Sequence, residues 1–125
     1  MAIRKLGLEW LSVNVGKPAG RVHVSRYYTD DKSWCKQSVW WFEIPLAAVD
    51  DDCDIHFLCQ KTPGGDDFFY LRVPPQFLKQ NQHRLFVRPD NGRLSMYFGT
   101  ERPDLFVELR ANGRVPFSQF VRSPK

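Results

Sequence analysis

Residues 54–73 read DIHFLCQKTPGGDDFFYLRV, which is two apolar, aromatic-rich runs separated by a turn sequence. The runs are Asp54–Cys59 and Phe68–Val73, and the segment Thr62–Asp67 between them holds proline, two glycines and two aspartates. Such residues favour tight turns, and aromatic and β-branched residues favour strands. This stretch therefore predicts a β-hairpin. Pro74 and Pro75 end its second strand, and Pro75 suits the first position of a helix near residues 75–82.

Strand patterns continue on both sides of this hairpin. Upstream, Leu11–Val15 and Arg21–Ser25 alternate around a Gly- and Pro-containing turn, which predicts a first hairpin. The segment Ile3–Leu11 fits either a helix or a strand, because its apolar residues match both periods and Gly7 weakens a helix. Ser38–Ile44 is dense in aromatic residues and predicts a strand buried on much of both faces.

The C-terminal half predicts a three-stranded meander and a closing segment. Its strands are Leu85–Val87, Leu94–Phe98 and Leu105–Leu109, and Val115–Val121 is a short helical turn or edge segment. We therefore predict an α+β fold, mainly an antiparallel β-sheet of six to eight strands with one short helix near residues 75–82. At 125 residues, we expect a single domain spanning 1–125.

Composition limits the classes of protein that fit. Hydrophobic residues make up 42% of the chain and aromatic residues 14%, which argues against disorder. The longest uncharged apolar stretch, Ser38–Phe42, is far below the ~18 residues that cross a bilayer. Because no apolar run follows Arg4 and Lys5, and three cysteines are an odd number, we expect a cytoplasmic protein with reduced thiols and no membrane contact.

The formal charge of +4 lies in the second half of the chain, where eight of the eleven arginines occur at or after Arg72. Successive side chains of a strand point to opposite faces of the sheet. If the apolar residues of the C-terminal strands face the core, their arginine and aromatic side chains lie on the opposite face. Phe68 and Tyr70 have the same parity and join this outer set. The residues of the predicted face on which we place a binding site are Arg72, Arg84, Phe86, Arg88, Arg93, Tyr97, Phe106 and Arg110.

Three interpretations of this face remain open. Aromatic rings and arginines are the means by which proteins bind single-stranded nucleic acid, and they are equally common in protein interfaces, including homodimers. Alternatively the face is packed inside the protein, covered by Ile3–Leu11. Trp34 is a further candidate for a partner contact, and the adjacent Trp40 and Trp41 must point to opposite faces of one strand.

Metal and catalytic sites have less support. Cys53, His56 and Cys59 have side chains that bind zinc, but in a strand the two cysteines face one side and His56 the other. The acidic cluster Asp50–Asp54, or Glu108, could hold a divalent cation in a nuclease-like enzyme, which is our alternative hypothesis. The chain has no phosphate-binding loop or nucleophile elbow. We expect a small accessory or binding domain with no cofactor.

Overall fold

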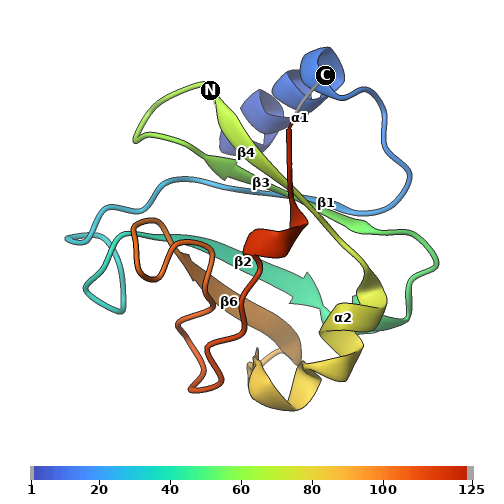
Figure 1. Cartoon of the computed structure of the whole chain (residues 1–125), viewed down its shortest axis with the longest axis vertical. Helices are drawn as coiled ribbons and strands as arrows, with labels where there is room; N and C mark the ends of the chain where they lie inside the picture. Colours follow the sequence, from blue (N-terminus) through green and yellow to red (C-terminus); the bar gives the residue numbers. More distant parts are fainter. Residues whose placement is uncertain (1, 124–125) are drawn as a thin grey trace.

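Two β-sheets and two α-helices form the α+β fold of this protein (Figure 1). The structure is a computed structural model that describes residues 2–123. It has seven strands in two mostly antiparallel sheets, within the predicted range of six to eight. The predicted fold class is therefore confirmed. None of the helices in the described part of the chain is long and apolar enough to cross a bilayer.

The first sheet, called sheet A, has the strand order β1-β3-β4-β7. Its strands are β1 (Val22–Ser25), β3 (Ile55–Gln60), β4 (Phe68–Val73) and β7 (Val121–Arg122). The predicted central hairpin is confirmed, because β3 pairs antiparallel with β4 across the Thr62–Asp67 turn. β1 runs parallel to β3, and the short β7 pairs with Tyr70 and Leu71 of β4.

The second sheet, called sheet B, has the order β2-β6-β5 and is wholly antiparallel. Its strands are β2 (Val39–Pro45), β5 (Phe86–Val87) and β6 (Arg93–Gly99). Between β4 and β5 in sequence lies α2 (Pro75–Gln80), with Pro75 in its first turn. This helix is confirmed. It ends two residues before the predicted boundary and continues as a 3-10 turn, η2 (Gln82–Arg84). A second 3-10 turn, η1 (Leu46–Asp50), follows β2.

The N-terminal segment forms a helix, α1 (Ile3–Asn14), so the strand predicted at Leu11–Val15 is wrong. Trp10 and Leu11 pack with Leu58, Phe68 and Tyr70 of sheet A. Burial of these apolar side chains against sheet A stabilises the helix. This gain outweighs the low helix propensity of Gly7. Because residues 11–14 belong to α1, they cannot form the strand predicted to pair with Arg21–Ser25. The strand β1 instead runs parallel to β3, and the predicted first hairpin is wrong.

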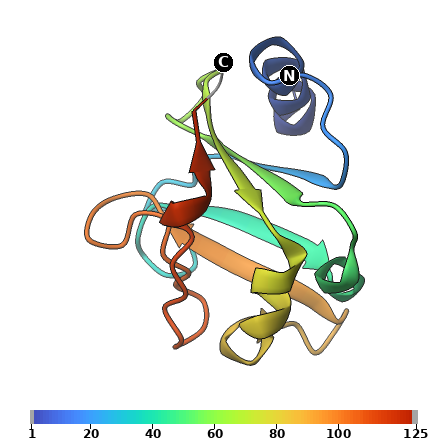
Figure 2. The same cartoon turned by 45° about the vertical axis from the view of Figure 1, so that its right-hand side comes forward.

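The molecule has three layers, which Figure 2 shows from the side: α1, then sheet A, then sheet B. The main core lies between the sheets and contains side chains such as Trp40, Phe57, Leu71 and Phe98. Sheet A is therefore packed on both faces, on one by sheet B and on much of the other by α1. The other face of sheet B points away from this core. The candidate site lies on that outer face.

The third strand predicted in the C-terminal meander does not form. Residues 105–109 make only isolated bridges, including Phe98 with Glu108 and Gly99 with Leu105. Phe106 has a φ of 59°, in the left-handed region, so the alternation of a strand is interrupted there. Further on, a 3-10 turn η3 (Ser118–Phe120) leads into β7, as the interpretation of a helical turn or edge segment predicted.

Candidate functional site

The outer face of sheet B gathers aromatic side chains from strands that are far apart in sequence. The pairing of β2 with β6 places Trp41 opposite Tyr97 and Glu43 opposite Ser95, and β5 adds Phe86 opposite Ser95. These residues alternate with core residues such as Trp40 and Met96, so their side chains leave the opposite side of the sheet. We call the set of Tyr28, Trp34, Trp41, Phe86, Tyr97 and Arg110 the aromatic face.

Trp34 lies on top of this face, although it comes from the loop that precedes β2. Its ring stacks on Tyr97, with centroids 6.0 Å apart and an angle of 13° between the planes. Its centroid is 4.8 Å from that of Trp41 in an edge-on arrangement, and Tyr28 packs edge-on at 6.0 Å. Trp34 therefore covers Tyr97 while 60% of its own surface stays exposed.

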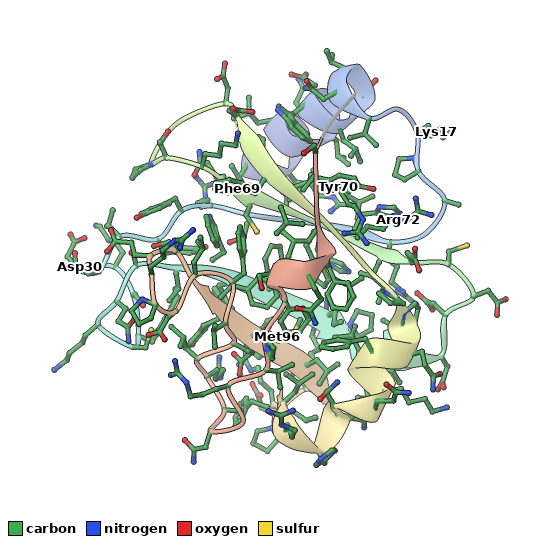
Figure 3. All side chains as sticks on the ribbon, in the orientation of Figure 1. Lys17, Asp30, Phe69, Tyr70, Arg72 and Met96 are labelled. Carbon is green, nitrogen blue, oxygen red and sulfur yellow. The ribbon has the colours of Figure 1, made fainter. Side chains whose placement is uncertain are left out.

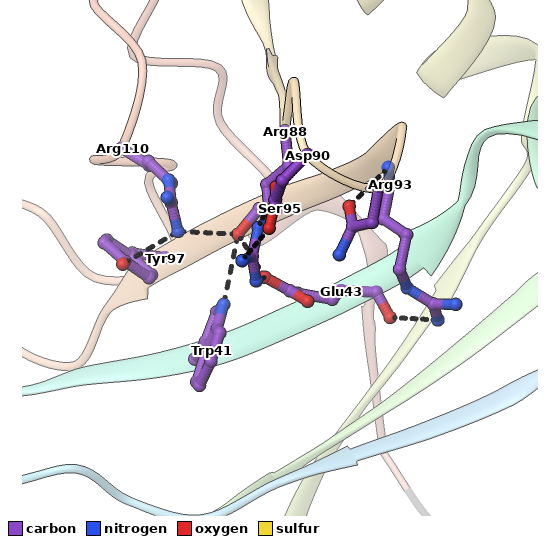
Figure 4. A network of polar contacts seen from close by, with 9 residues as sticks. Trp41, Glu43, Arg88, Asp90, Arg93, Ser95, Tyr97 and Arg110 are labelled. Carbon is purple, nitrogen blue, oxygen red and sulfur yellow. Dashed lines mark hydrogen bonds and ion pairs between the residues drawn. The ribbon is translucent and has the colours of Figure 1, made fainter.

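Arg110 is the cation of the aromatic face. Its guanidinium lies 4.4 Å from the centre of the Phe86 ring and 4.9 Å from that of Tyr97. One terminal nitrogen donates hydrogen bonds of 2.8 Å to Ser95 Oγ and to the Tyr97 hydroxyl (Figure 4). No salt bridge joins Arg110 to a carboxylate within residues 2–123. The arginine is thus pre-positioned by rings and hydroxyl groups, and it forms no direct ion pair with a carboxylate of the described residues.

Arg88, in contrast, is neutralised by two acids. Its guanidinium donates to Glu43 at 2.7 Å and to Asp90 at 2.6 Å, and these hydrogen bonds raise its pKa, with Asp90 the larger cause. Arg93 donates to the backbone carbonyl of Glu43 at 3.2 Å (Figure 4). Ser95 joins the two halves of this network, because it donates to Glu43 and accepts from Arg110 and Trp41.

Glu108 supports the face from beneath. Its fully buried carboxylate accepts hydrogen bonds from the backbone amides of Tyr97, Arg110 and Ala111 at 2.8–2.9 Å. Burial raises the pKa of Glu108, and these amides lower it in part. The carboxylate therefore fixes the segment that carries Arg110 to β6, and its oxygens are already engaged.

Phe106 is a correction to the predicted site. It lies in the core at 5% exposure, where its ring stacks on Trp40 at 5.2 Å and packs edge-on against Phe69. Strand parity placed it outside, but its segment is not a strand, and its positive φ turns the side chain inward. In the same segment Glu108 is buried. Leu105, Val107 and Leu109, which would face the core if residues 105–109 formed the predicted strand, are only partly buried.

Arg72 is also placed wrongly by the predicted face. It lies on β4 of sheet A, where it pairs with Asp54, whereas the aromatic face belongs to sheet B. Phe68 and Tyr70, its neighbours of the same parity, are buried under α1. The segment Ile3–Leu11 does act as a covering layer, as one interpretation held, but it covers sheet A.

Arg84 has a local structural role. It lies in η2 and donates to the carbonyl of Gly113 and to Asn81, which ties the loop around residue 113 to the end of α2. Of the eight predicted residues, the structure therefore brings Phe86, Arg88, Arg93, Tyr97 and Arg110 together on one side of sheet B.

Three of the acidic residues considered for metal binding are engaged in ion pairs. Asp50 pairs with Lys79, Asp51 with Arg21, and Asp54 with Arg72. Cys59 is buried in the core, where burial raises the pKa of its thiol, and His56 points to the other face of β3 toward Tyr70. Within residues 2–123, no three His, Cys, Asp or Glu side chains lie together as a metal site.

Sequence reasoning missed two residues that organise the face. Glu43 is a single charge within the aromatic strand Val39–Pro45, and this is the signal that an outward position existed there. Ser95 had no distinguishing signal, because its role as a shared hydrogen-bond partner depends on contacts among three separate segments. No known protein family matches the chain, and no curated protein or solved structure is detectably similar to it.

Proposed function

We propose that this protein is a small interaction domain that binds a protein partner through the aromatic face. The observation that carries the proposal is Trp34, which is 60% exposed yet stacked on Tyr97, the ring that the guanidinium of Arg110 also contacts. Tryptophan, tyrosine and arginine are the residue types that contribute most binding energy in protein interfaces. The partner surface that fits would offer a carboxylate for Arg110 and an apolar side chain for Trp34.

The charges of the face favour a protein over single-stranded nucleic acid. Arg88 is compensated by Glu43 and Asp90, and these two carboxylates would repel a phosphate backbone. Tyr97 is only 6% exposed beneath Trp34, and Tyr28, Trp41 and Phe86 are each only partly exposed, so Trp34 is the one ring of the aromatic face that lies mostly in solvent. Proteins that bind single strands generally offer several stacking positions along a basic groove.

Site-specific photo-crosslinking in the native host tests this proposal. We would replace Trp34 by the photoreactive residue p-benzoylphenylalanine, and use the same replacement of Val13, which is 85% exposed on α1, as a matched control. A discrete protein adduct at position 34 that is absent at position 13 is expected. Arg110→Ala should abolish this adduct, because the anchor for the partner's carboxylate is removed.

The other outcomes would replace the proposed ligand with nucleic acid, show no specific ligand, or identify the protein partner as a second copy of this chain. A nuclease-sensitive adduct, or a fluorescence titration in which oligonucleotide affinity falls steeply with salt, would identify nucleic acid as the ligand. Equal adducts at positions 34 and 13 would show non-specific contact. A light-scattering mass of two chains, together with a self-adduct at position 34, would make the partner a second copy of this protein.

We also propose that the domain works in the cytoplasm. All three cysteines, Cys35, Cys53 and Cys59, are free thiols, a state that reducing compartments maintain. Fractionation of host cells, followed by detection of the protein, tests this point directly.

A further inference from the structure

A cavity separate from the aromatic face lies on the α1 side of sheet A. It has a volume of about 430 Å³, within the usual size of small-molecule sites. The loop that follows α1 contributes Lys17 and Ala19, β3 and β4 contribute His56, Tyr70 and Arg72, and the turn before β3 contributes Asp52 and Asp54. Figure 3 shows Tyr70 and Arg72 along β4 on the side where the loop with Lys17 passes.

The wall of this cavity contains a polar pair with fixed donor and acceptor roles. His56 is 3% exposed, and its Nε2 lies 2.8 Å from the carbonyl oxygen of Ala19. A carbonyl only accepts, so in the neutral imidazole Nε2 carries the hydrogen and Nδ1 accepts from the Tyr70 hydroxyl at 2.7 Å. The phenol oxygen of Tyr70 then keeps free lone pairs, and it can accept a hydrogen bond from a ligand.

The cavity also offers cationic donors. Arg72 uses only Nε to bind Asp54, at 2.8 Å, and no hydrogen bond engages its two terminal nitrogens in the described part of the chain. Lys17 is exposed, and none of the ion pairs formed by residues 2–123 includes it. Planar guanidinium groups bind carboxylate and phosphate oxygens in a two-pronged way.

We propose that this cavity binds a small hydroxylated anion, whose carboxylate or phosphate group is held by Arg72 and Lys17 and whose hydroxyl donates to Tyr70. Asp54 is engaged with Arg72 and orients it, which leaves Asp52 as the one uncompensated acid of the lining. Asp52 is exposed and solvent screens its charge, but it disfavours ligands with a second anionic group. The expected ligand therefore carries a single anionic group.

NMR titration of the labelled protein tests the site with defined probes. Glycolate and acetate form a matched pair that differs by one hydroxyl, and glycerol phosphate is the phosphate probe. We expect saturable shifts at the Lys17 amide and the His56 imidazole, with glycolate binding more tightly than acetate. Whichever of glycolate and glycerol phosphate binds more tightly identifies the anionic group of the ligand.

Substitutions distinguish specific binding in the cavity from non-specific attraction of anions to a positively charged surface. Arg72→Gln should weaken glycolate binding by roughly tenfold or more, and Arg72→Lys by less, because lysine keeps the charge without the planar fork. Lys79→Gln is the matched control, since Lys79 pairs with Asp50 and its side chain is 56% exposed, the same as Arg72. Tyr70→Phe should remove the advantage of glycolate over acetate.

Two results would overturn the proposal. Shifts that do not saturate, or that Arg72→Gln and Lys79→Gln reduce equally, would mean an adventitious ion only. Equal affinities for glycolate and acetate in the wild-type protein would contradict the hydroxyl contact with Tyr70. The aromatic face takes no part in this experiment, so failure here is distinguishable from failure of the proposed function.

Discussion

Individual buried polar residues should strongly affect the stability of this protein. Glu108 is the clearest case, because its carboxylate accepts hydrogen bonds from the Tyr97 amide of β6 and from the Arg110 and Ala111 amides of a segment that is neither helix nor strand. A buried amide group without a partner costs free energy, so the carboxylate replaces the pairing that a sheet would provide.

Glu108→Gln should therefore destabilise the protein by about 2–3 kcal/mol, because glutamine has one acceptor oxygen and turns an NH2 group toward backbone N–H donors. Urea unfolding would measure the change. Glu101→Gln, at an exposed position, is the control and should stay within about 0.5 kcal/mol of wild type. An equal effect of both substitutions would show that the buried contacts of Glu108 contribute nothing.

His23 should make the protein sensitive to mild acid. Burial, reinforced by Arg4, Arg21 and Arg93, lowers the pKa of His23 to about 4, and its Nε2 is buried without a hydrogen-bond partner among the described residues. The unfolded chain has a histidine pKa near 6.5, so between pH 6.5 and 4 the unfolded state binds more protons. Stability contributed by neutral His23 is complete above pH 6.5 and is lost as the pH falls toward 4.

Comparing wild type with His23→Leu isolates this effect. From pH 7 to pH 4.5, wild type should lose about 2 kcal/mol more unfolding free energy than the variant, because leucine cannot be protonated. Carboxylates such as Asp67 and Asp90 titrate in both proteins and cancel in the comparison. Parallel losses in chemical denaturation at the two pH values would contradict the assignment.

At the scale of elements, α1 depends on a close approach to sheet A. A Cβ added at Gly7 would lie 2.6 Å from Cγ1 of Val24 on β1, closer than real atoms approach. Gly7 weakens the helix locally, but it allows α1 to lie against the strand.

Gly7→Ala should therefore destabilise the fold by about 1–2 kcal/mol, although alanine is the better helix former, because overpacking outweighs propensity. Thermal unfolding would show the sign directly. Ser12→Ala, at an exposed position of the same helix, should instead raise the melting temperature slightly. A stabilised Gly7→Ala protein would mean that α1 moves away from Val24 without loss.

For the whole molecule, the two sheets divide the tryptophans between core and surface. Trp40 is 1% exposed and contacts Tyr27, Phe69 and Phe106, whereas Trp34 lies on the outer face of sheet B. The same residue type should thus contribute mainly stability at one position and mainly binding at the other.

Trp40→Ala is expected to cost about 3–5 kcal/mol of unfolding free energy, because it leaves a large cavity between the sheets. Trp34→Ala should cost about 1 kcal/mol or less, because the ring is already largely in water. Chemical denaturation of both variants makes the comparison. A cost at Trp34 as large as that at Trp40 would indicate that the indole is needed for folding, which removes the main support for the proposed function.

The sequence by itself determined the elements whose periodicity and turn residues agree: the hairpin around Thr62–Asp67, the helix that begins at Pro75, and the strands β2 and β6. Tertiary structure decided the rest. Packing of Trp10 and Leu11 on sheet A favours a helix over a strand in the N-terminal segment. In residues 105–109, the buried contacts of Phe106 and Glu108 replace the alternation of inward and outward side chains that a strand would have. Which arginines keep a free charge was also decided in three dimensions, because Glu43 reaches Arg88 but not Arg110 only once β2, β5 and β6 are assembled.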